Sequence, residues 1–448
     1  MNRKNSSGGK SLLLGRHKRL RTGALLLILV LTVAMETQVV NALYCAKVQT
    51  WKWGTLTSIL SVASGDVDGD GKTEIVTGGY FGGATAMAQL CVWDGATLAF
   101  ENVRTWQWGS ATQISSVAVG DVDSDGQMEI VTGGEYMYGG LRVAQLCVWS
   151  GATLALEKVQ AWQWTGDTWI ESVAVGDVDG DGKKEVVSGG CYFDGAFYNA
   201  QLCVWDGATL AFENVQAWYW TGSTYIKSVA VGDVDGDAKM EIVTGGHYRD
   251  PYYRKAQLCV WNGATLTLEN VETWAASGSV FLNSVAVGDV DGNGNLEIVT
   301  GGYYMDGSLA IAQFTVRNGA TLKERFLKTW YWNDDTYVNS VALGDVDGDG
   351  WKEIVTGGYY WDGGREVAQL CFWEIKLLWP GILYLSYEDS AAWYWDDNTR
   401  IESVAVGNVD AYGDIEVVTG GDYWHQENYL DQDLYAQLCV WEFGGAIL

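Results

Sequence analysis

One motif recurs along the whole of this chain. The segment SVAVGDVDGDG, or a close variant, occurs seven times, and its Gly-Asp or Gly-Asn pair begins at Gly65, Gly120, Gly176, Gly232, Gly288, Gly344 and Gly407. The copies are almost evenly spaced, and only the last interval is clearly longer than the others. A regular period of this kind indicates a repeat architecture, in which each copy forms one supersecondary unit. The chain is therefore expected to fold as a series of similar units rather than around a single core.

Each copy is predicted to contain four β-strands. An apolar strand such as residues 116–120 precedes an acidic loop such as 121–129; a second strand reads EIVTGG, a third reads AQLCVW, and a fourth ends in Trp-x-Trp. These β-branched and aromatic runs are bounded by Gly, Asn and Asp, as strands are. Seven such copies predict an all-β, seven-bladed β-propeller. A β-solenoid is the alternative, disfavoured because the interval from Gly120 to Gly176 is long for one solenoid coil.

Short turns are expected after the third strands. The pairs Asp94-Gly95, Asp206-Gly207, Asn262-Gly263 and Asn318-Gly319 fit two-residue hairpin turns, in which both central residues have φ > 0.

The two ends of the repeat region complement one another. The repeat cores begin near residues 61, 116, 172, 228, 284, 340 and 403, and the last copy has no fourth strand. Residues 44–53 match the fourth-strand pattern of 101–108 but follow no earlier copy. We therefore expect this N-terminal strand to pair with the last unit, close the ring and leave no open edge there.

The segment 1–42 differs from the rest. A basic stretch precedes the uncharged apolar run GALLLILVLTVAM at 23–35, and the small or modest residues Val40-Asn41-Ala42 follow. This layout is typical of a secretory signal peptide. An uncleaved N-terminal membrane anchor is the alternative, although the apolar run falls short of the roughly 20 residues that a spanning helix needs. Residues 43–448 are expected to be secreted or to lie at the extracellular surface.

The composition excludes two broad classes. With 48% hydrophobic residues, the chain is too apolar for a disordered protein. Residues 1–42 hold seven of the 28 basic and one of the 56 acidic side chains, so the remainder carries a net charge of −34. That charge argues against a nucleic-acid partner, and the membrane is expected to be contacted only through an uncleaved N-terminal segment.

The acidic loops have the spacing of a calcium site. In the first loop, carboxylates stand at positions 1, 3, 5 and 9, Gly71 permits a sharp turn at position 6, and position 7 offers its backbone carbonyl. Calcium takes six to eight hard oxygen ligands in a flexible geometry, and the absence of His and Cys disfavours zinc. The candidate ligands are Asp66, Asp68, Asp70, Lys72, Glu74; Asp121, Asp123, Asp125, Gln127, Glu129; Asp177, Asp179, Asp181, Lys183, Glu185; Asp233, Asp235, Asp237, Lys239, Glu241; Asp289, Asp291, Asn293, Asn295, Glu297; and Asp345, Asp347, Asp349, Trp351, Glu353.

Three loops depart from the pattern. In the fifth copy, Asn293 stands at position 5 and offers a neutral oxygen ligand. Ala238 replaces the turn glycine of the fourth copy, which predicts a weaker site because a Cβ disfavours φ > 0. Tyr412 removes the third ligand of the seventh copy, and we expect little or no binding there. The prediction is about six calcium ions with a structural role and a degenerate seventh loop.

The acidic loop followed by a hydrophobic strand resembles the FG-GAP, or VCBS, repeat of integrin alpha-chain head domains and of many secreted microbial proteins. The resemblance covers residues 44–448, and the element that names the family survives loosely as Phe81-Gly82-Gly83-Ala84. It implies a propeller with calcium in the hairpins between the first and second strands of each blade. It implies no activity.

The loops after the second strands vary between copies and are rich in aromatic residues. Variable loops on a constant scaffold are where a propeller carries a site, and aromatics beside polar groups suit a glycan or a protein partner. The Trp-x-Trp pairs are expected instead to pack between units. The candidate ligand-binding residues are Tyr136, Tyr138, Tyr192, Tyr248, Tyr304, Tyr360, Trp361 and Trp424.

Three functions compete. The first is a binding module for an extracellular glycan or protein, the second a polysaccharide lyase or hydrolase, and the third a structural component of the cell surface. After residue 42 the chain contains only two histidines, His247 and His425, and no organic-cofactor motif. No catalytic residue is therefore assigned, and the binding module is preferred.

Two further features stay open. Cys45 is expected to lie diagonal to Cys439 if residues 44–53 pair with the last unit, so either a disulfide or two thiols would fit. The longest interval between copies contains the insertion 374–384, whose Pro380-Gly381 pair predicts an extended hairpin. That hairpin would either dock a partner or a membrane surface, or fold over the central channel.

Overall fold

The computed structural model describes residues 42–83, 85–378, 381–410, 412–428 and 431–444, and every element in them is a β-strand. Residues 43–444 form one compact unit of structure. The predicted signal peptide or anchor at 1–42 lies outside the described residues except for Ala42. The described part of the chain contains no helix with the length and apolarity that a membrane crossing requires.

The strands fall into seven groups of four, which are called units one to seven below. Unit one holds β2 (Leu56–Gly65), β3 (Glu74–Gly82), β4 (Ala86–Asp94) and β5 (Phe100–Trp106); unit two holds β6 (Thr112–Gly120), β7 (Glu129–Tyr138), β8 (Leu141–Ser150) and β9 (Leu156–Trp162). Unit three holds β10 (Thr168–Gly176), β11 (Glu185–Phe193), β12 (Tyr198–Asp206) and β13 (Phe212–Trp218); unit four holds β14 (Thr224–Gly232), β15 (Glu241–Arg249), β16 (Arg254–Asn262) and β17 (Leu268–Trp274). Unit five holds β18 (Val280–Gly288), β19 (Glu297–Asp306), β20 (Leu309–Asn318) and β21 (Glu324–Trp330); unit six holds β22 (Thr336–Gly344), β23 (Glu353–Trp361), β24 (Glu366–Leu378) and β25 (Ile382–Trp393). Unit seven holds β26 (Thr399–Gly407), β27 (Glu416–Asn428), β28 (Asp431–Gly444) and the N-terminal strand β1 (Ala42–Trp51), which pairs with β28.

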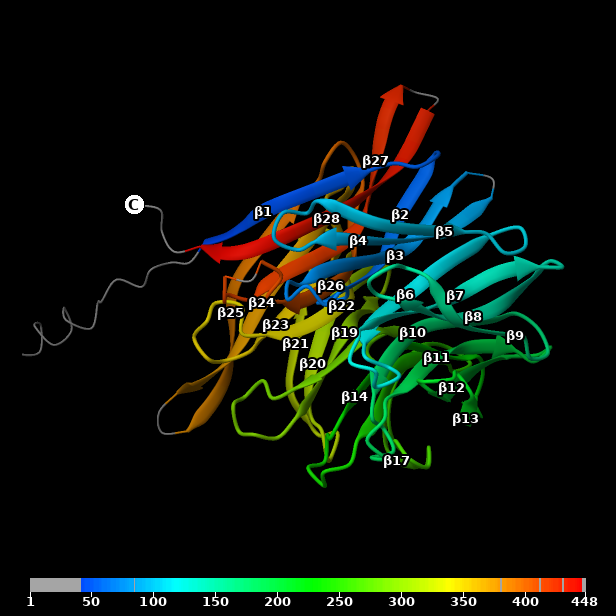
Figure 1. Ribbon diagram of the computed structural model, residues 1–448. Coiled ribbons are helices and arrows are strands. Elements are labelled where there is room, and N and C mark those ends of the chain that lie inside the picture. The colour runs from blue at the N-terminus through cyan, green and yellow to red at the C-terminus, as the bar shows by residue number, and fades with distance from the viewer. Residues whose placement is uncertain (1–41, 84, 379–380, 411, 429–430, 445–448) are drawn as a thin grey trace, which may run out of the picture. The chain divides into compact units, whose positions relative to one another are not determined.

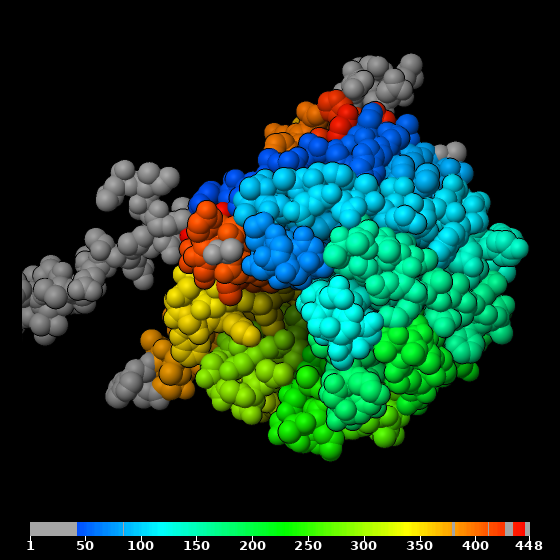
Figure 2. Space-filling model, viewed as in Figure 1, coloured from blue at the N-terminus to red at the C-terminus, as the bar shows by residue number. Residues whose placement is uncertain are grey.

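Units two to six are separate antiparallel sheets, whereas units one and seven share one eight-stranded sheet. The junction is a single parallel pairing of Leu56 on β2 with Leu434 on β28. Figure 1 shows the blue β1 lying along the red β28, so strands from the two ends of the repeat region are neighbours. In Figure 2 the colours follow one another from unit to unit, and blue and red surfaces meet.

The strand pattern predicted from the sequence is confirmed as an all-β fold, but the first strands are longer than predicted. β6 begins at Thr112 rather than near residue 116. Thr112 is fully buried, and its Oγ1 both accepts a hydrogen bond from the Trp108 backbone N–H at 2.7 Å and donates one to the Trp108 carbonyl at 2.9 Å. The hydroxyl thus satisfies backbone groups that would otherwise be unpaired at the start of the strand.

The predicted two-residue turns are wrong. Asp94 is followed by a longer turn in which the Leu98 N–H donates to the Asp94 carbonyl at 2.8 Å, and it is Leu98, not Gly95, that has a positive φ, 55°. Gly95 is needed for space: a Cβ there would lie 2.4 Å from the Thr73 carbonyl oxygen and 2.2 Å from that of Val409. The glycine therefore permits a close approach of backbones rather than a special dihedral angle.

Neighbouring units pack through the first glycine of the Gly-Gly pair in each second strand. A Cβ on Gly78 would lie 2.5 Å from Val117 Cγ1 of unit two, so only glycine lets the sheets approach this closely. The first Trp of each Trp-x-Trp completes the contact: the rings of Trp106 and Trp149 are 4.6 Å apart, and Trp106 Nε1 donates to Gln145 Oε1. The predicted role of these tryptophans in packing between units is confirmed at this position.

A serine also links each first strand to the next. The Val117 N–H donates to Ser61 Oγ at 3.0 Å, and the same bond recurs in every later pair of units. The remaining bonds join Val173 to Ser116, Val229 to Ser172, Val285 to Ser228, Val341 to Ser284, Val404 to Ser340, and Val62 to Ser403. The last of these joins unit one to unit seven.

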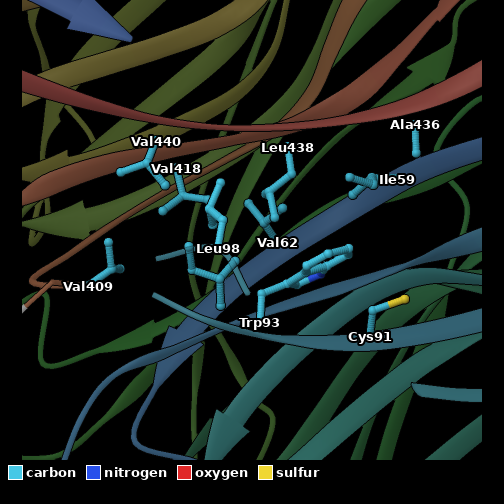
Figure 3. Packing of buried hydrophobic residues seen from close by; sticks show 11 residues of the cluster. Ile59, Val62, Cys91, Trp93, Leu98, Val409, Val418, Ala436, Leu438 and Val440 are labelled. Atoms are coloured by element: carbon cyan, nitrogen blue, oxygen red, sulfur yellow. The ribbon is translucent and has the colours of Figure 1, made fainter. Parts of the chain in front are cut away.

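The core between units one and seven is built like the others. Figure 3 shows Ile59, Val62 and Trp93 of unit one packed with buried residues of unit seven, which include Leu438 and Val440. The first and last units are therefore held together by buried apolar surface as well as by hydrogen bonds.

Candidate functional site

The acidic loops lie at one end of the sheets, called the acidic end, between the first and second strands of each unit. In the first loop, Asp66 Oδ2 accepts the Gly71 N–H at 3.1 Å, Asp68 Oδ1 accepts the Asp70 N–H at 3.0 Å, and Asp70 Oδ1 accepts the Lys72 N–H at 2.9 Å. Each carboxylate thus uses one oxygen to fix the loop backbone. The second oxygen of Asp70 also accepts from Lys72 Nζ at 2.7 Å, whereas Asp66 Oδ1 is buried without a hydrogen bond and is available to a ligand.

The bond from position 6 repeats in loops two to six, and in loops two to five the second oxygen of the position-1 aspartate also accepts a backbone N–H. The position-1 carboxylates accept from position 6 at 3.1, 3.0, 3.0, 2.8 and 3.0 Å in loops two to six, at Asp121, Asp177, Asp233, Asp289 and Asp345. Acidic side chains close enough to share one ion occur in loops one to four, as the groups Asp66–Asp68–Asp70, Asp121–Asp123–Asp125, Asp177–Asp179–Glu185 and Asp233–Asp235–Glu241. The structure therefore brings together the predicted carboxylates within each of these loops.

The position-9 glutamate closes each loop. Glu74 is buried, and its Oε2 accepts the Val67 N–H at 2.8 Å, so a single oxygen remains free to face the aspartates. Burial raises the pKa of Glu74 to about 7, partly opposed by the Val67 hydrogen bond and reinforced by the charge of Asp68. Burial is also the largest cause that raises the pKa of the equivalent glutamates. The pKa is about 7 for Glu129, Glu185, Glu241, Glu297 and Glu416, and about 8 for Glu353.

Several of these oxygens have no partner. Asp66 Oδ1, Asp123 Oδ1, Asp345 Oδ1 and Glu353 Oε1 are buried and accept no hydrogen bond. A buried carboxylate oxygen without a donor is costly unless a cation meets it. The donor set, all hard oxygen, fits calcium, and in these loops the predicted aspartates and glutamate would hold it.

A further acidic residue, not predicted from the sequence, comes from the fourth strands. Glu157 lies within 4.8 Å of Asp123 and Glu129, ligand atom to ligand atom. It is the extra residue of a β-bulge, since Val148 pairs with Lys158 and Trp149 with Leu156. The bulge re-aims its side chain toward the acidic loop. The available signal was the repeated Glu at this position, found as Glu101, Glu157, Glu213, Glu269 and Glu388.

The space between the first two acidic loops is a cleft of about 290 Å³, lined by residues that include Asp66, Asp68, Asp125, Glu129 and Glu157. The cleft is thus lined by carboxylates from two units.

Loop five differs from the others because an arginine lies between two of its buried acidic side chains; in loop two, Lys158 Nζ bonds one loop carboxylate, Asp123 Oδ2, at 3.2 Å. Arg325 takes the bulge position where units one to four and six have Glu, and its Nη1 donates to Glu297 Oε1 at 2.6 Å and to Asp291 Oδ2. Both acceptor side chains are buried. The guanidinium therefore occupies the side of the loop where an ion would be coordinated.

In loops four and seven the structure shows how Ala238 and Tyr412 are placed. Ala238 has φ of 68°, in the region where the equivalent Gly71 has 86°. In the seventh loop, Tyr412 is 86% exposed and only its backbone N–H bonds to Asp410 Oδ1, at 2.9 Å. Tyr412 therefore contributes no side-chain oxygen to that loop.

The predicted ligand residues lie at the opposite end of the sheets, called the aromatic end. Tyr136, Tyr192, Tyr248 and Tyr360 share one register position and pack on the second Trp of a Trp-x-Trp pair, with ring centroids 5.7, 5.9, 6.2 and 6.1 Å apart. Tyr304 packs on a core cluster, Tyr138 is 68% exposed, and Trp361 and Trp424 are half-buried. The structure brings these residues to one end but not into one contiguous cluster.

The same end exposes aromatic residues for which the sequence predicts a packing role. Trp164, Trp220, Trp332 and Trp395, the second members of their pairs, are each more than a third exposed. Their indole N–H groups are held: Trp332 Nε1 donates to Gln369 Oε1 at 2.6 Å, and the other three bond the equivalent glutamine of the next unit. The rings are thus fixed in place with part of their surface in solvent. Tyr219, Tyr331 and Tyr394 stand beside them and are also exposed.

The cysteines and the inserted hairpin have clear positions. All eight cysteines are free thiols, and Cys45 contacts Cys439: the hydrogen bond between them raises the pKa of Cys439 and lowers that of Cys45. The insertion extends β24 and β25 beyond the sheet, with Leu377, Leu378 and Ile382 each more than half exposed.

These observations define a class of protein built from repeated four-stranded β-sheets with an acidic hairpin in each. Residues 66–132 match the family of FG-GAP-like repeats, so the resemblance seen in the sequence is confirmed there, and the other units repeat the same strands. A search of curated proteins finds no relative of the chain.

Proposed function

We propose that this protein is an exported, calcium-stabilised, seven-bladed β-propeller that binds an extracellular glycan or protein through its aromatic end. The export part of the proposal rests on the layout of residues 1–42. The observation that carries the binding function is the set of exposed, fixed aromatic rings gathered at one end of a regular scaffold.

The closed ring is supported by the serine bonds between first strands. They run from each unit to the next and return from Ser403 to Val62 of unit one. The pairing of β1 with β28 supplies the fourth strand of unit seven from the other end of the chain. Both features favour a ring over an open solenoid, because a solenoid would leave its first and last units apart.

Calcium is supported by the unpartnered carboxylate oxygens and by the charge of the body. Without cations, several carboxylates crowd within one loop on a chain whose net charge after residue 42 is −34. A bound divalent ion would supply positive charge and cross-link the hairpin. The role assigned to it is structural.

The aromatic end suits recognition because its rings are rigid. A planar ring that is already held by a hydrogen bond loses little conformational entropy on binding. Aromatic faces beside polar groups fit the apolar face of a sugar ring or the side chains of a protein surface. A large exposed aromatic set on an otherwise acidic surface marks an interaction site.

The test is a binding screen of the full chain on arrayed glycans and on extracellular protein fractions, with calcium and with EDTA. Trp332→Ala and Trp361→Ala should reduce the observed binding at least tenfold, with the melting temperature unchanged. The matched control is Tyr412→Ala, which removes an exposed aromatic ring from the acidic end and should leave binding intact. Binding that survives both tryptophan changes would remove the aromatic end as the site.

A further inference from the structure

The seven units of this chain can be compared with one another, and they differ most at a few positions. The Gly-Gly pair of the second strand is present in all seven copies, but the residue that follows it changes from copy to copy. That residue is Tyr80, Glu135, Cys191, His247, Tyr303, Tyr359 or Asp422. A purely structural position in a repeat tends to keep one residue type, so this variation indicates a function that differs around the molecule.

Two positions of the first strand vary in the same way. One pairs with the residue after Gly-Gly and the other is the bulge residue two places further on. The paired position holds Ser58, Gln113, Trp169, Tyr225, Phe281, Tyr337 and Arg400, and the bulge position holds Leu60, Ser115, Glu171, Lys227, Asn283, Asn339 and Glu402. We call the residues at these three positions, together with Arg142, Tyr198, Arg254 and Glu366 at the starts of third strands, the variable belt.

Aromatic rings of the belt touch one another across consecutive units. Tyr225 lies 5.3 Å from His247 of its own unit, and His247 lies 5.2 Å from Phe281 of unit five. The series continues through Tyr303, stacked on Phe281 at 4.6 Å, and through Tyr337, whose ring centroid lies 4.8 Å from that of Tyr303. At one end of the series, the rings of Tyr337 and Tyr359 are stacked at 4.7 Å. At the other end, Trp169 contacts Tyr198, and Tyr198 contacts Tyr225. The belt therefore presents a continuous aromatic arc over units three to six.

The arc separates two charged clusters. In the first, Lys227 Nζ bonds Glu171 Oε1 at 2.6 Å, and Gln113 Nε2 donates to the buried Glu135 at 2.8 Å. Arg142 lies over the ring of Trp169 at 4.9 Å and ties this cluster to the arc.

In the second cluster, the Arg400 guanidinium bonds both oxygens of Glu366, and Ser58 Oγ donates to the buried Asp422 at 2.6 Å. Asn339 Nδ2 donates to Glu402 at 3.2 Å, and Arg400 lies over the ring of Tyr359 at 5.0 Å. Acids and bases are nearly balanced across the belt, so it selects no strongly charged ligand.

One buried polar atom in the arc has no partner. His247 is 3% exposed; its Nε2 is bonded to Arg254 Nη1 at 2.8 Å, and its Nδ1 has no hydrogen bond. Because an arginine can only donate, Nε2 accepts and Nδ1 carries the proton. An unsatisfied buried N–H costs free energy, and a ligand hydroxyl would satisfy it.

We propose that the variable belt is a binding site for a neutral carbohydrate, a proposal that rests on the function proposed above. The aromatic arc provides faces for the apolar side of sugar rings. Its residues Trp169, Tyr225, Phe281, Tyr303 and Tyr337 are half-buried, so part of each ring reaches solvent. The flanking carboxylates accept hydrogen bonds from sugar hydroxyls, and Lys227, Arg254 and Arg400 donate to sugar oxygens. Nearly balanced charge and a mixture of donors and acceptors suit an uncharged polyhydroxylated ligand.

The experiment uses the calcium-loaded full chain on a printed array of neutral and uronic-acid-containing oligosaccharides, followed by titration calorimetry with the best neutral binder. Phe281→Ala and Arg254→Gln should each weaken that Kd at least tenfold, and Tyr337→Phe, which keeps the ring, should change it less than threefold. Tyr412→Ala is the control, because this change at the acidic end should leave sugar binding by the belt intact. Melting temperatures within a few degrees of the parent protein identify the variants that are folded.

The outcomes separate the two proposals. Binding of a neutral sugar that is lost in the belt variants supports the belt. A sugar or protein ligand whose binding depends on Trp332 and Trp361 but not on Phe281 or Arg254 overturns the belt and leaves the proposed function standing. Binding of uronic-acid oligosaccharides alone overturns the neutral class, and a chain that binds neither arrayed glycans nor extracellular proteins overturns both proposals.

Discussion

Arg325 Nη1 donates a hydrogen bond to Glu297 Oε1 at 2.6 Å, and this contact places a protein cation inside the fifth acidic loop. In units one to four the same bulge position carries Glu, which adds negative charge to the loop. The exchange of Glu for Arg reverses the charge that an incoming ion would meet. Loop five therefore holds a guanidinium at the position where loops one to four hold a further carboxylate.

The first prediction is that the protein binds five calcium ions, in loops one to four and six, rather than six. Arg325→Glu should raise the number to six, because it removes the competing guanidinium and restores the acidic residue found at this position in units one to four. Elemental analysis of dialysed protein measures the number directly. Lys323→Glu, the same charge change on an exposed neighbour, should leave it at five; six ions in the parent protein would contradict the prediction.

The second prediction concerns Ala238 in loop four, held at φ of 68°. The left-handed region costs a residue with a Cβ about 1–2 kcal/mol. Ala238→Gly should therefore raise the free energy of unfolding by about 1 kcal/mol in EDTA and tighten calcium binding to that loop. Urea denaturation measures the first effect, with Ala196→Gly, an exposed loop alanine without positive φ, as the control that should not be stabilised.

The third prediction concerns the contact between units. Gly133→Ala should destabilise the protein by about 1–3 kcal/mol, because the new Cβ would lie 2.5 Å from Val173 Cγ1 of the next unit. Gly364→Ala is the matched control, since its Cβ would meet nothing closer than Asp362 Oδ1 at 3.6 Å. Equal melting temperatures for the two variants would show that the first glycine of the pair has no role in packing between units.

The strands and the loop carboxylates could be predicted because they depend on local pattern. Alternating apolar residues are visible in any single copy and the Asp-x-Asp-x-Asp spacing in copies one to four and six, and repetition confirms both patterns. The turn at Leu98 could not be predicted, since Gly95 is required by the carbonyl of the distant Val409 rather than by its own dihedral angles. A contact of this kind is set by packing between units.

The roles of Glu157 and Arg325 were hidden for a different reason. Both are bulge residues, and a bulge shifts the alternation by one residue, so simple period-two reasoning assigns their side chains to the wrong face. For the Tyr-Tyr pairs, by contrast, period-two alternation assigns the side chains to the correct faces. Tyr303 and Tyr304 are adjacent and face opposite sides of the sheet, so Tyr303 joins the belt, while Tyr304 packs on a core cluster.

The fourth prediction is that calcium removal weakens the fold through individual loops. Asp179→Asn in loop three removes a charged ligand and should lower the calcium-induced rise in melting temperature. The lost stabilisation should be roughly 2–3 kcal/mol when the calcium concentration is one hundred times the Kd of that site. Asp410→Asn in the degenerate seventh loop should leave the rise unchanged. Calorimetric scans in EDTA and in calcium measure both, and a parent protein with the same melting temperature in each would contradict a structural role for the ion.

The fifth prediction concerns His247, whose pKa is lowered to about 3 by burial first and then by the charges of Lys227 and Arg254. In the unfolded chain a histidine titrates near pH 6.5, so below that pH the unfolded state binds a proton that the folded state does not. The stability contributed by neutral His247 is therefore present above about pH 6.5 and is lost progressively as the pH falls toward 3. Between pH 7 and pH 5 the parent protein should lose about 2 kcal/mol more than His247→Gln. Urea denaturation of both proteins at the two pH values in EDTA gives this difference, and parallel losses would mean that His247 is protonated in the folded protein.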